Sequence, residues 1–71
     1  SKVPIKAILG KTSITVGDFI DLQCGDVIPL DVSVNSDVNI LVGNILKFRG
    51  KPGVKKNKIS VKITEIVKKD V

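Results

Sequence analysis

Apolar and polar side chains alternate along several short segments of the chain, and this two-residue period predicts β-strands. The first such segment covers residues 3–9, and we expect a turn at Gly10 and Lys11 to fold it back onto a short strand at 14–16. Glycine at the first central position of a two-residue loop accepts the positive φ of a type II′ turn, which favours a hairpin here.

Residues 17–26 do not continue this alternation and contain helix-capping and turn residues instead. Gly17 interrupts the alternation, and Asp18 is expected to cap a helix of about one turn. Gly25 and Asp26 form a turn cluster that stops this helix early.

The middle of the chain predicts short extended pieces and one hairpin. Residues 27–28 are expected to form a brief strand, and residues 30–37 an exposed connection with an extended piece within it. Alternation returns at 38–42 and 45–49, on either side of Gly43 and Asn44, which predicts a β-hairpin with its turn at 43–44.

The C-terminal third predicts one more turn and one more strand. Pro52 and Gly53 suit the second and third positions of a type II turn. Residues 55–58 are expected to form a basic loop, 59–67 an amphipathic strand, and 68–71 a charged tail.

Composition supports a strand-rich fold. Val and Ile supply 21 of the 71 residues, against five Leu and one Ala, and β-branched side chains favour the pleated surface of a sheet. We therefore predict a mostly β, single domain over residues 1–71, with about five strands, one short helical turn and a core from about residue 3 to residue 67. The chain begins at Ser1 and contains no Met, so we expect it to be a domain of a longer protein.

A domain of this size has difficulty burying enough apolar surface by itself. With only two aromatic residues, the core is expected to supply no more than roughly 3–5 kcal/mol of stability, so we predict that apolar strand positions are shared across a dimer or with a related chain. The alternative is that the same positions fill the core of a monomer. The candidate interface residues are Val38, Ile40, Val42, Phe48, Val54, Ile59, Val61, Ile63 and Ile66.

The residue types present argue against catalysis and metal binding. The chain has no His and a single cysteine, so it has no imidazole base, no internal disulfide and no four-ligand zinc site. The spacing of the five Asp residues before residue 47 does not match a calcium loop and is explained by turns and caps. We read Cys24 as a small apolar filler and residues 50–53 as a turn, since the phosphate-loop pattern is absent. We expect no catalysis, no metal and no cofactor.

Charge is unevenly distributed along the chain. Residues 12–46 carry five Asp and no base, whereas residues 47–71 carry nine bases and two acids. Complementary regions of this kind can pair between two copies or with a related chain. A nucleic-acid-binding module is the alternative, but Phe48 is the only aromatic residue in the basic third and alternates toward the core side, so we expect no nucleic-acid partner.

The chain resembles the surface-presentation-of-antigens (SpoA) domain family, found in flagellar motor switch proteins and in cytoplasmic-ring proteins of type III secretion. The resemblance covers about residues 3–67 and is most specific over residues 22–31, Leu-Gln-Cys-Gly-Asp-Val-Ile-Pro-Leu-Asp, together with Gly43 and Asn44. N-type switch proteins usually carry a run of valines after the hairpin glycine. Lys51 and Pro52 interrupt that run here, which favours an M-type chain.

This resemblance implies an intertwined β dimer, either a homodimer or a pair with an N-type chain, within the C-ring at the base of the flagellum. It implies a structural role in assembling the switch complex and relaying the direction of rotation, or the equivalent place in a type III secretion ring. We expect a soluble, cytoplasmic domain at the cytoplasmic face of the inner membrane, held there through the assembled motor without membrane insertion. The expected turn residues are Gly10, Gly17, Gly25, Asp26, Gly43, Asn44, Pro52 and Gly53.

Overall fold

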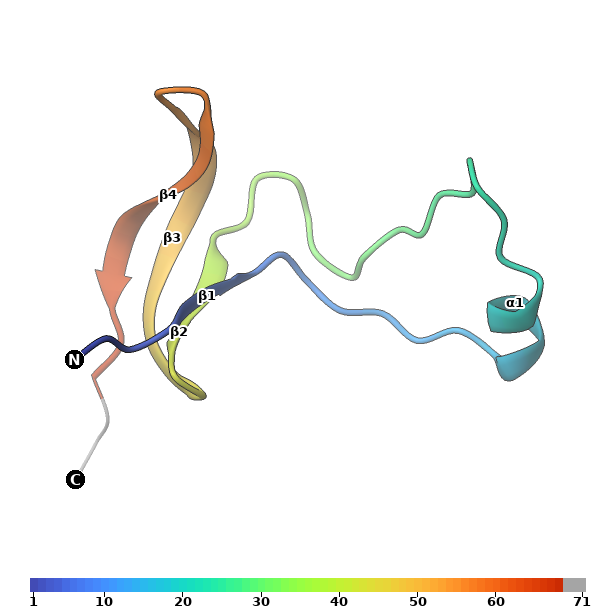
Figure 1. The fold of residues 1–71 in the computed structure, drawn as a ribbon, viewed down its shortest axis with the longest axis horizontal. Coiled ribbons are helices and arrows are strands. Elements are labelled where there is room, and N and C mark those ends of the chain that lie inside the picture. Colours follow the sequence, from blue (N-terminus) through green and yellow to red (C-terminus); the bar gives the residue numbers. More distant parts are fainter. Residues whose placement is uncertain (69–71) are drawn as a thin grey trace.

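The computed structural model describes residues 1–68, and it consists of one small antiparallel sheet and a long arm (Figure 1). The four strands are β1 (Ile5–Ile8), β2 (Val38–Val42), β3 (Ile45–Lys55) and β4 (Lys58–Ile66), and they lie in the order β1-β2-β3-β4. The fold is therefore mostly β, as predicted, with four strands where about five were expected. The predicted tail falls largely on residues 69–71, which lie outside the described residues.

Two tight turns connect the three long strands. Gly43 has a φ of +62° in the turn between β2 and β3, in the position that requires the positive φ. The turn between β3 and β4 is formed by Lys56 and Asn57, with φ values of 53° and 64°. Both central residues of that turn are thus left-handed, which is the type I′ geometry that matches the twist of a hairpin.

The predicted turn at Pro52 and Gly53 is wrong, because both residues lie inside β3 and pair with Val61 and Ser60 of β4. Strand β2 pairs with β3 only as far as Gly50, so the β2 side of β3 is open from there to the hairpin tip. Proline lacks an amide donor and is tolerated where a strand has an open edge. Pro52 therefore continues the strand.

Gly50 allows β3 to lie close to its neighbours at the centre of the sheet. It is buried, and a Cβ atom in its place would lie 2.5 Å from the Lys62 carbonyl oxygen and 3.0 Å from Ile40 Cδ1. A bulge in the register with β4 follows directly on Arg49. Only glycine fits this position without displacing backbone.

The arm covers residues 9–37, between β1 and β2, and it extends far from the sheet before returning (Figure 1). The segment that leaves the sheet after β1 and the segment that returns to β2 lie side by side near the sheet. There the Asp31 amide donates to the Lys11 carbonyl (2.9 Å) and the Lys11 amide donates to Asp31 Oδ1 (3.1 Å). A Cβ atom on Gly10 would lie 2.4 Å from a methyl carbon of Val32. Gly10 thus permits the close approach of the two segments.

The predicted hairpin at Gly10 is wrong, and so are the predicted strands at 14–16 and 27–28. Gly10 does not have a positive φ, so the chain continues outward at this residue. The two predicted strands lie in the arm beyond its Lys11–Asp31 contact, and neither pairs with another strand. This is why the structure has fewer strands than the alternation of side chains predicted.

The short helix α1 (Val16–Ile20) is present, but it begins earlier than predicted. Thr15 is the N-cap, and its hydroxyl oxygen accepts a hydrogen bond from the Asp18 amide (3.0 Å). Asp18 therefore lies in the first turn of α1, where its negative charge interacts favourably with the helix dipole. Gly17 lies inside the helix, whereas it was predicted to lie in a turn.

A turn at residues 23–26 follows the helix at the far end of the arm. Gly25 has a φ of +97°, and Asp26 Oδ2 accepts a hydrogen bond from the Gln23 amide (2.9 Å). Cys24 in this turn is exposed, so the interpretation of its side chain as a core filler is wrong for the single chain. The arm tip contains no core for it to fill.

Very little apolar surface is buried within the chain. Val38 and Ile40, in β2, are the only buried hydrophobic side chains among residues 1–68. The radius of gyration is 15.3 Å, whereas a compact domain of this length has one of about 11 Å. In the part of the chain that the structure describes, no helix is long and apolar enough to cross a membrane.

Candidate assembly surface

The register of the strands places apolar side chains on one face of the sheet. Directly paired residues point to the same side, so the pairs Ile40–Phe48, Phe48–Ile66 and Val54–Ile59 share a face. We call this the apolar face. Its members are Ile5, Ala7, Val38, Ile40, Val42, Ile45, Phe48, Pro52, Val54, Ile59, Val61, Ile63 and Ile66.

Burial of the apolar face decreases from β2 to the hairpin tip. Phe48 and Val61 are half-buried, whereas Val54 is 77% exposed and Ile59 is 90% exposed. The hairpin of β3 and β4 also carries a groove lined by residues of both faces, namely Lys51, Pro52, Gly53, Val54, Lys55, Ser60, Val61 and Lys62. All nine residues predicted for an interface lie on this one face, and the structure leaves most of it open to solvent.

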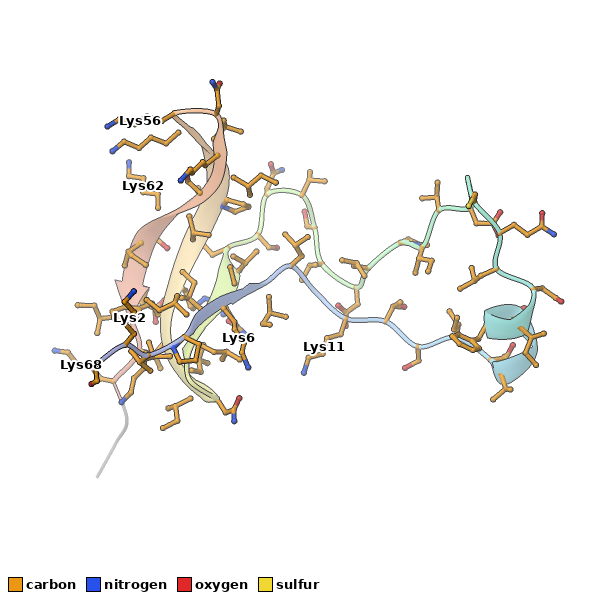
Figure 2. All side chains as sticks on the ribbon, viewed as in Figure 1. Lys2, Lys6, Lys11, Lys56, Lys62 and Lys68 are labelled. Atoms are coloured by element: carbon orange, nitrogen blue, oxygen red, sulfur yellow. The ribbon has the colours of Figure 1, made fainter. Side chains whose placement is uncertain are left out.

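The opposite face of the hairpin is basic. The same register places Lys51 opposite Lys62, and Lys55 opposite Lys58, on the side away from the apolar face. Figure 2 shows Lys56 and Lys62 projecting from the hairpin at the end of the molecule away from the arm. Phe48 points to the apolar face, so it offers no stacking surface among these lysines.

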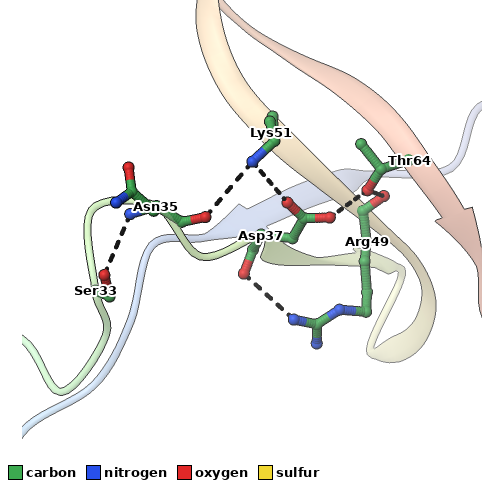
Figure 3. Close-up of polar contacts among 6 residues, drawn as sticks. All are labelled: Ser33, Asn35, Asp37, Arg49, Lys51 and Thr64. Atoms are coloured by element: carbon green, nitrogen blue, oxygen red, sulfur yellow. Dashed lines mark hydrogen bonds and ion pairs between the residues drawn. The ribbon is translucent and has the colours of Figure 1, made fainter.

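A cluster of polar groups joins the end of the arm to the sheet (Figure 3). Asp37, the residue before β2, forms an ion pair with Lys51 (Oδ1 to Nζ, 3.4 Å) and accepts a hydrogen bond from the Thr64 hydroxyl. The Arg49 guanidinium donates to the Asp37 carbonyl (3.4 Å) and to Asn39 Oδ1 (2.7 Å). These contacts link the start of β2 to β3 and β4.

The carboxyl group of Asp37 is held in its charged form by this cluster. The Thr64 hydroxyl is the main cause of its lowered pKa, and hydrogen bonding to Lys51 and the charges of Lys51 and Arg49 act in the same direction. Partial burial opposes them, since the Asp37 side chain is 26% exposed. The cluster is thus a structural tie whose strength depends on charge, and no motif in the sequence indicated it.

The arm carries a second set of exposed apolar side chains, which the sequence prediction of an interface missed. In α1, Val16 is 77% exposed, Phe19 is 67% exposed and Ile20 is 72% exposed. Further along the arm, Val27 and Val34 are 87% and 97% exposed. The signal in the sequence is that hydrophobic residues continue through residues 9–37, although this segment has too little helix and strand to bury them.

Side chains of the types that bind metals do not gather in the described residues. No group of three or more His, Cys, Asp or Glu side chains comes together in residues 1–68. What the geometry does provide is a one-sided apolar sheet and an arm with its own apolar side chains, and both are suited to contact with another chain.

Comparison with known proteins places these features in a family. The family model described as "Type III flagellar switch regulator (C-ring) FliN C-term" matches residues 1–68. The chain is 40% identical over 62 residues to the flagellar motor switch protein FliM of Thermotoga maritima and 37% identical over 65 residues to that of Bacillus subtilis. These matches cover 87% and 92% of this chain but only 19% and 20% of the two relatives.

Two further matches extend the comparison beyond FliM. The flagellar motor switch protein FliN of Caulobacter vibrioides is 35% identical over 66 residues, which is 93% of this chain and 60% of that protein. The crystal structure of the C-terminal domain of HrcQb from Pseudomonas syringae pv. phaseolicola has the same fold, with a TM-score of 0.78 at 13% identity over 94% of this chain and 93% of that one. The chain therefore belongs to the family of the C-terminal domain of the flagellar switch proteins FliM and FliN.

Proposed function

We propose that this chain is a structural assembly module of the C-ring of the flagellar motor switch complex, of the M type, which pairs with itself or with an N-type switch protein. Its similarity to FliM and FliN supports this role, and so does the open apolar face. In this role the domain is located at the cytoplasmic face of the inner membrane, within the basal body, and passes on changes in the direction of rotation. It needs no cofactor and performs no catalysis.

The observation that carries the proposal is the amount of surface that the single chain leaves uncovered. Its accessible surface is 6642 Å², whereas a compact protein of 7.6 kDa exposes about 4300 Å². The excess of about 2300 Å² per chain, or about 4600 Å² for two chains, lies within the range of total area that obligate homodimers bury. A partner chain is the simplest means of covering it.

The arrangement of the arm indicates how the partner covers that surface. In the single chain, α1 lies at the far end of the arm from the sheet (Figure 1), so its apolar side chains do not reach the apolar face of their own sheet. In a two-fold dimer, the arm of each chain can lie on the apolar face of the other. This exchange covers both apolar surfaces at once, and it is the pairing that we propose.

The first test is the molar mass of the purified chain by light scattering on a sizing column, alone and mixed with an N-type domain. We expect a mass of at least twice 7.6 kDa alone, or a stable mixed complex, and we expect the dimer itself to persist at high salt because its interface is apolar. A monomer that ignores the N-type domain would contradict the proposal.

A pair of substitutions tests whether the apolar face forms the interface. Ile59→Asp places a charge on that face and is expected to dissociate the dimer, since an unpaired charge is costly to bury. Ser60→Asp adds the same charge at the next residue, which points to the opposite face, and should leave the dimer intact. Equal dissociation by both variants would mean that the apolar face is not the contact surface.

A further inference from the structure

The hairpin of β3 and β4 carries like charges, of which the fold pairs only Lys51 with a carboxylate. Lys51 lies directly opposite Lys62, and Lys55 opposite Lys58, and like charges in directly paired positions destabilise a sheet. We call these four residues and Lys56, at the turn, the lysine face. Among residues 1–68 the one ion pair is between Lys51 and Asp37, so the other members of the lysine face have no carboxylate partner there.

The arm carries the complementary charge. Successive residues of an α-helix are about 100° apart, so Val16, Phe19 and Ile20 share one side of α1, and Asp18 and Asp21 lie on the other side. Asp18 and Asp21 are exposed, and the described residues form no ion pair with them. When the apolar side of α1 packs against a partner, these two carboxylates point away from that contact.

These two charged surfaces cannot meet within one chain. The hairpin tip and α1 lie at opposite ends of a molecule with a longest extent of 42 Å (Figures 1 and 2). The lysine face also lies on the side of the sheet away from the apolar face, so an arm that covers the apolar face leaves the lysines free. Asp18 and Asp21 therefore do not reach the lysine face within the dimer proposed above.

We propose that the lysine face of one dimer binds the acidic side of α1 from a second dimer, through Asp18 and Asp21. This inference rests on the arm-exchanged dimer proposed above and goes beyond it by assigning a second contact surface. The contact joins two different surfaces, so it is heterologous, and a repeated heterologous contact closes into a ring or continues as a filament. The charges thus supply a means of joining dimers side by side that does not use the apolar face.

Sedimentation velocity over a range of salt concentrations separates the two contacts. Between about 50 mM and about 500 mM NaCl the screening length falls from about 14 Å to about 4 Å, so the association of dimers is expected to weaken roughly tenfold or more while the dimer persists. Dimers that do not associate further at low salt would overturn this inference and leave the proposed function intact. A monomer at every salt concentration would overturn both.

Charge reversal identifies the surfaces. Variant K58E/K62E lowers the charge of the lysine face from +5 to +1, and variant D18K/D21K reverses the charge of the arm, so each alone is expected to form dimers that do not associate further. In an equimolar mixture the acidic arm of K58E/K62E can still bind the unchanged lysine face of D18K/D21K, so the mixture is expected to recover the higher species. Failure of the mixture to recover them would overturn the assignment of these two surfaces.

A nucleic acid is the competing ligand for a lysine face, and it is tested with the same variants. Binding of a labelled single-stranded oligouridine is followed by fluorescence anisotropy for the unchanged chain and for K58E/K62E. Loss of oligouridine binding together with unchanged self-association would show that the lysines serve nucleic acid, and would overturn the inference. Loss of self-association in K58E/K62E with no measurable oligouridine binding by the unchanged chain supports it.

Discussion

At the scale of single residues, Gly50 is the position where the sheet tolerates least change. A Cβ atom there would lie 2.6 Å from Val61 Cγ1 and even closer to the Lys62 carbonyl oxygen, which belongs to the backbone and cannot turn aside. Gly50→Ala is therefore expected to lower the free energy of unfolding by about 1–3 kcal/mol, measured by urea denaturation. Gly53→Ala is the control, because nothing lies within 4 Å of its Cβ position and its φ is not positive. Equal effects of the two substitutions would contradict this account of Gly50.

Asp37 gives the fold a dependence on pH. Its folded-state pKa is lowered, so its carboxylate stabilises the fold at pH values above the ordinary carboxyl pKa of about 3.9, and this contribution is lost as the pH falls through the lowered value. Thr64→Val removes the hydroxyl that is the main cause of the shift and is expected to raise the pKa of Asp37. The measurement is an NMR titration of the Asp37 side-chain carbon. Thr64→Ser keeps the hydroxyl and should keep the lowered pKa, and an identical pKa in the valine variant would contradict the assignment.

At the scale of elements, the turn between β3 and β4 contains a residue type poorly suited to it. Lys56 has a φ of 53°, a conformation that Asn and Gly adopt far more readily. Lys56→Asn is expected to stabilise the chain by about 0.5–1 kcal/mol in thermal denaturation. Lys56→Gln removes the same charge without the preference for a positive φ, and it should give little or no gain. Equal gains would mean that charge, and not backbone conformation, limits this hairpin.

The same elements show what the sequence could predict. Alternation at 38–42, 45–49 and 59–67 predicted β2, the first part of β3 and β4, because a sheet with one apolar side has a two-residue period. The second part of β3 was predicted to be a turn and a basic loop. The predicted position of the last turn was wrong because Pro52 and Gly53 match the sequence of a type II turn. Only the structure shows that β2 stops pairing with β3 at Gly50, so that Pro52 lies at an open edge of the strand. The helix start was wrong because Thr15 and Asp18 are both good caps.

The arm could not be predicted from the periodicity of its side chains. Its apolar residues alternate as they would in paired strands, yet segments such as 14–16 and 27–28 have no strand beside them in this chain. A sequence pattern indicates that a side chain needs cover, but it does not state whether that cover comes from the same chain or from another. The same limitation applies to Cys24, which is exposed at the arm tip.

At the scale of the whole molecule, the separation between arm and sheet is the central feature. The chain exposes about 2300 Å² more surface than a compact protein of its mass, and this excess includes both the apolar face and the apolar side of α1. A single proposed contact, the exchange of arms, covers both of these apolar surfaces. Membership of a family of ring components is consistent with a domain that reaches its stable form only in contact with other chains.

The most direct test of the arm exchange is an isotope-filtered NMR experiment on a mixture of labelled and unlabelled chains, which detects only contacts between different chains. We predict inter-chain nuclear Overhauser effects between the arm, at Phe19 or Ile20, and the apolar face, at residues such as Val54 or Ile59. These side chains lie on separate parts of a single chain, and all four are mostly exposed there. A dimer that shows no inter-chain contact between arm and apolar face, or a chain that remains a monomer, would contradict the account.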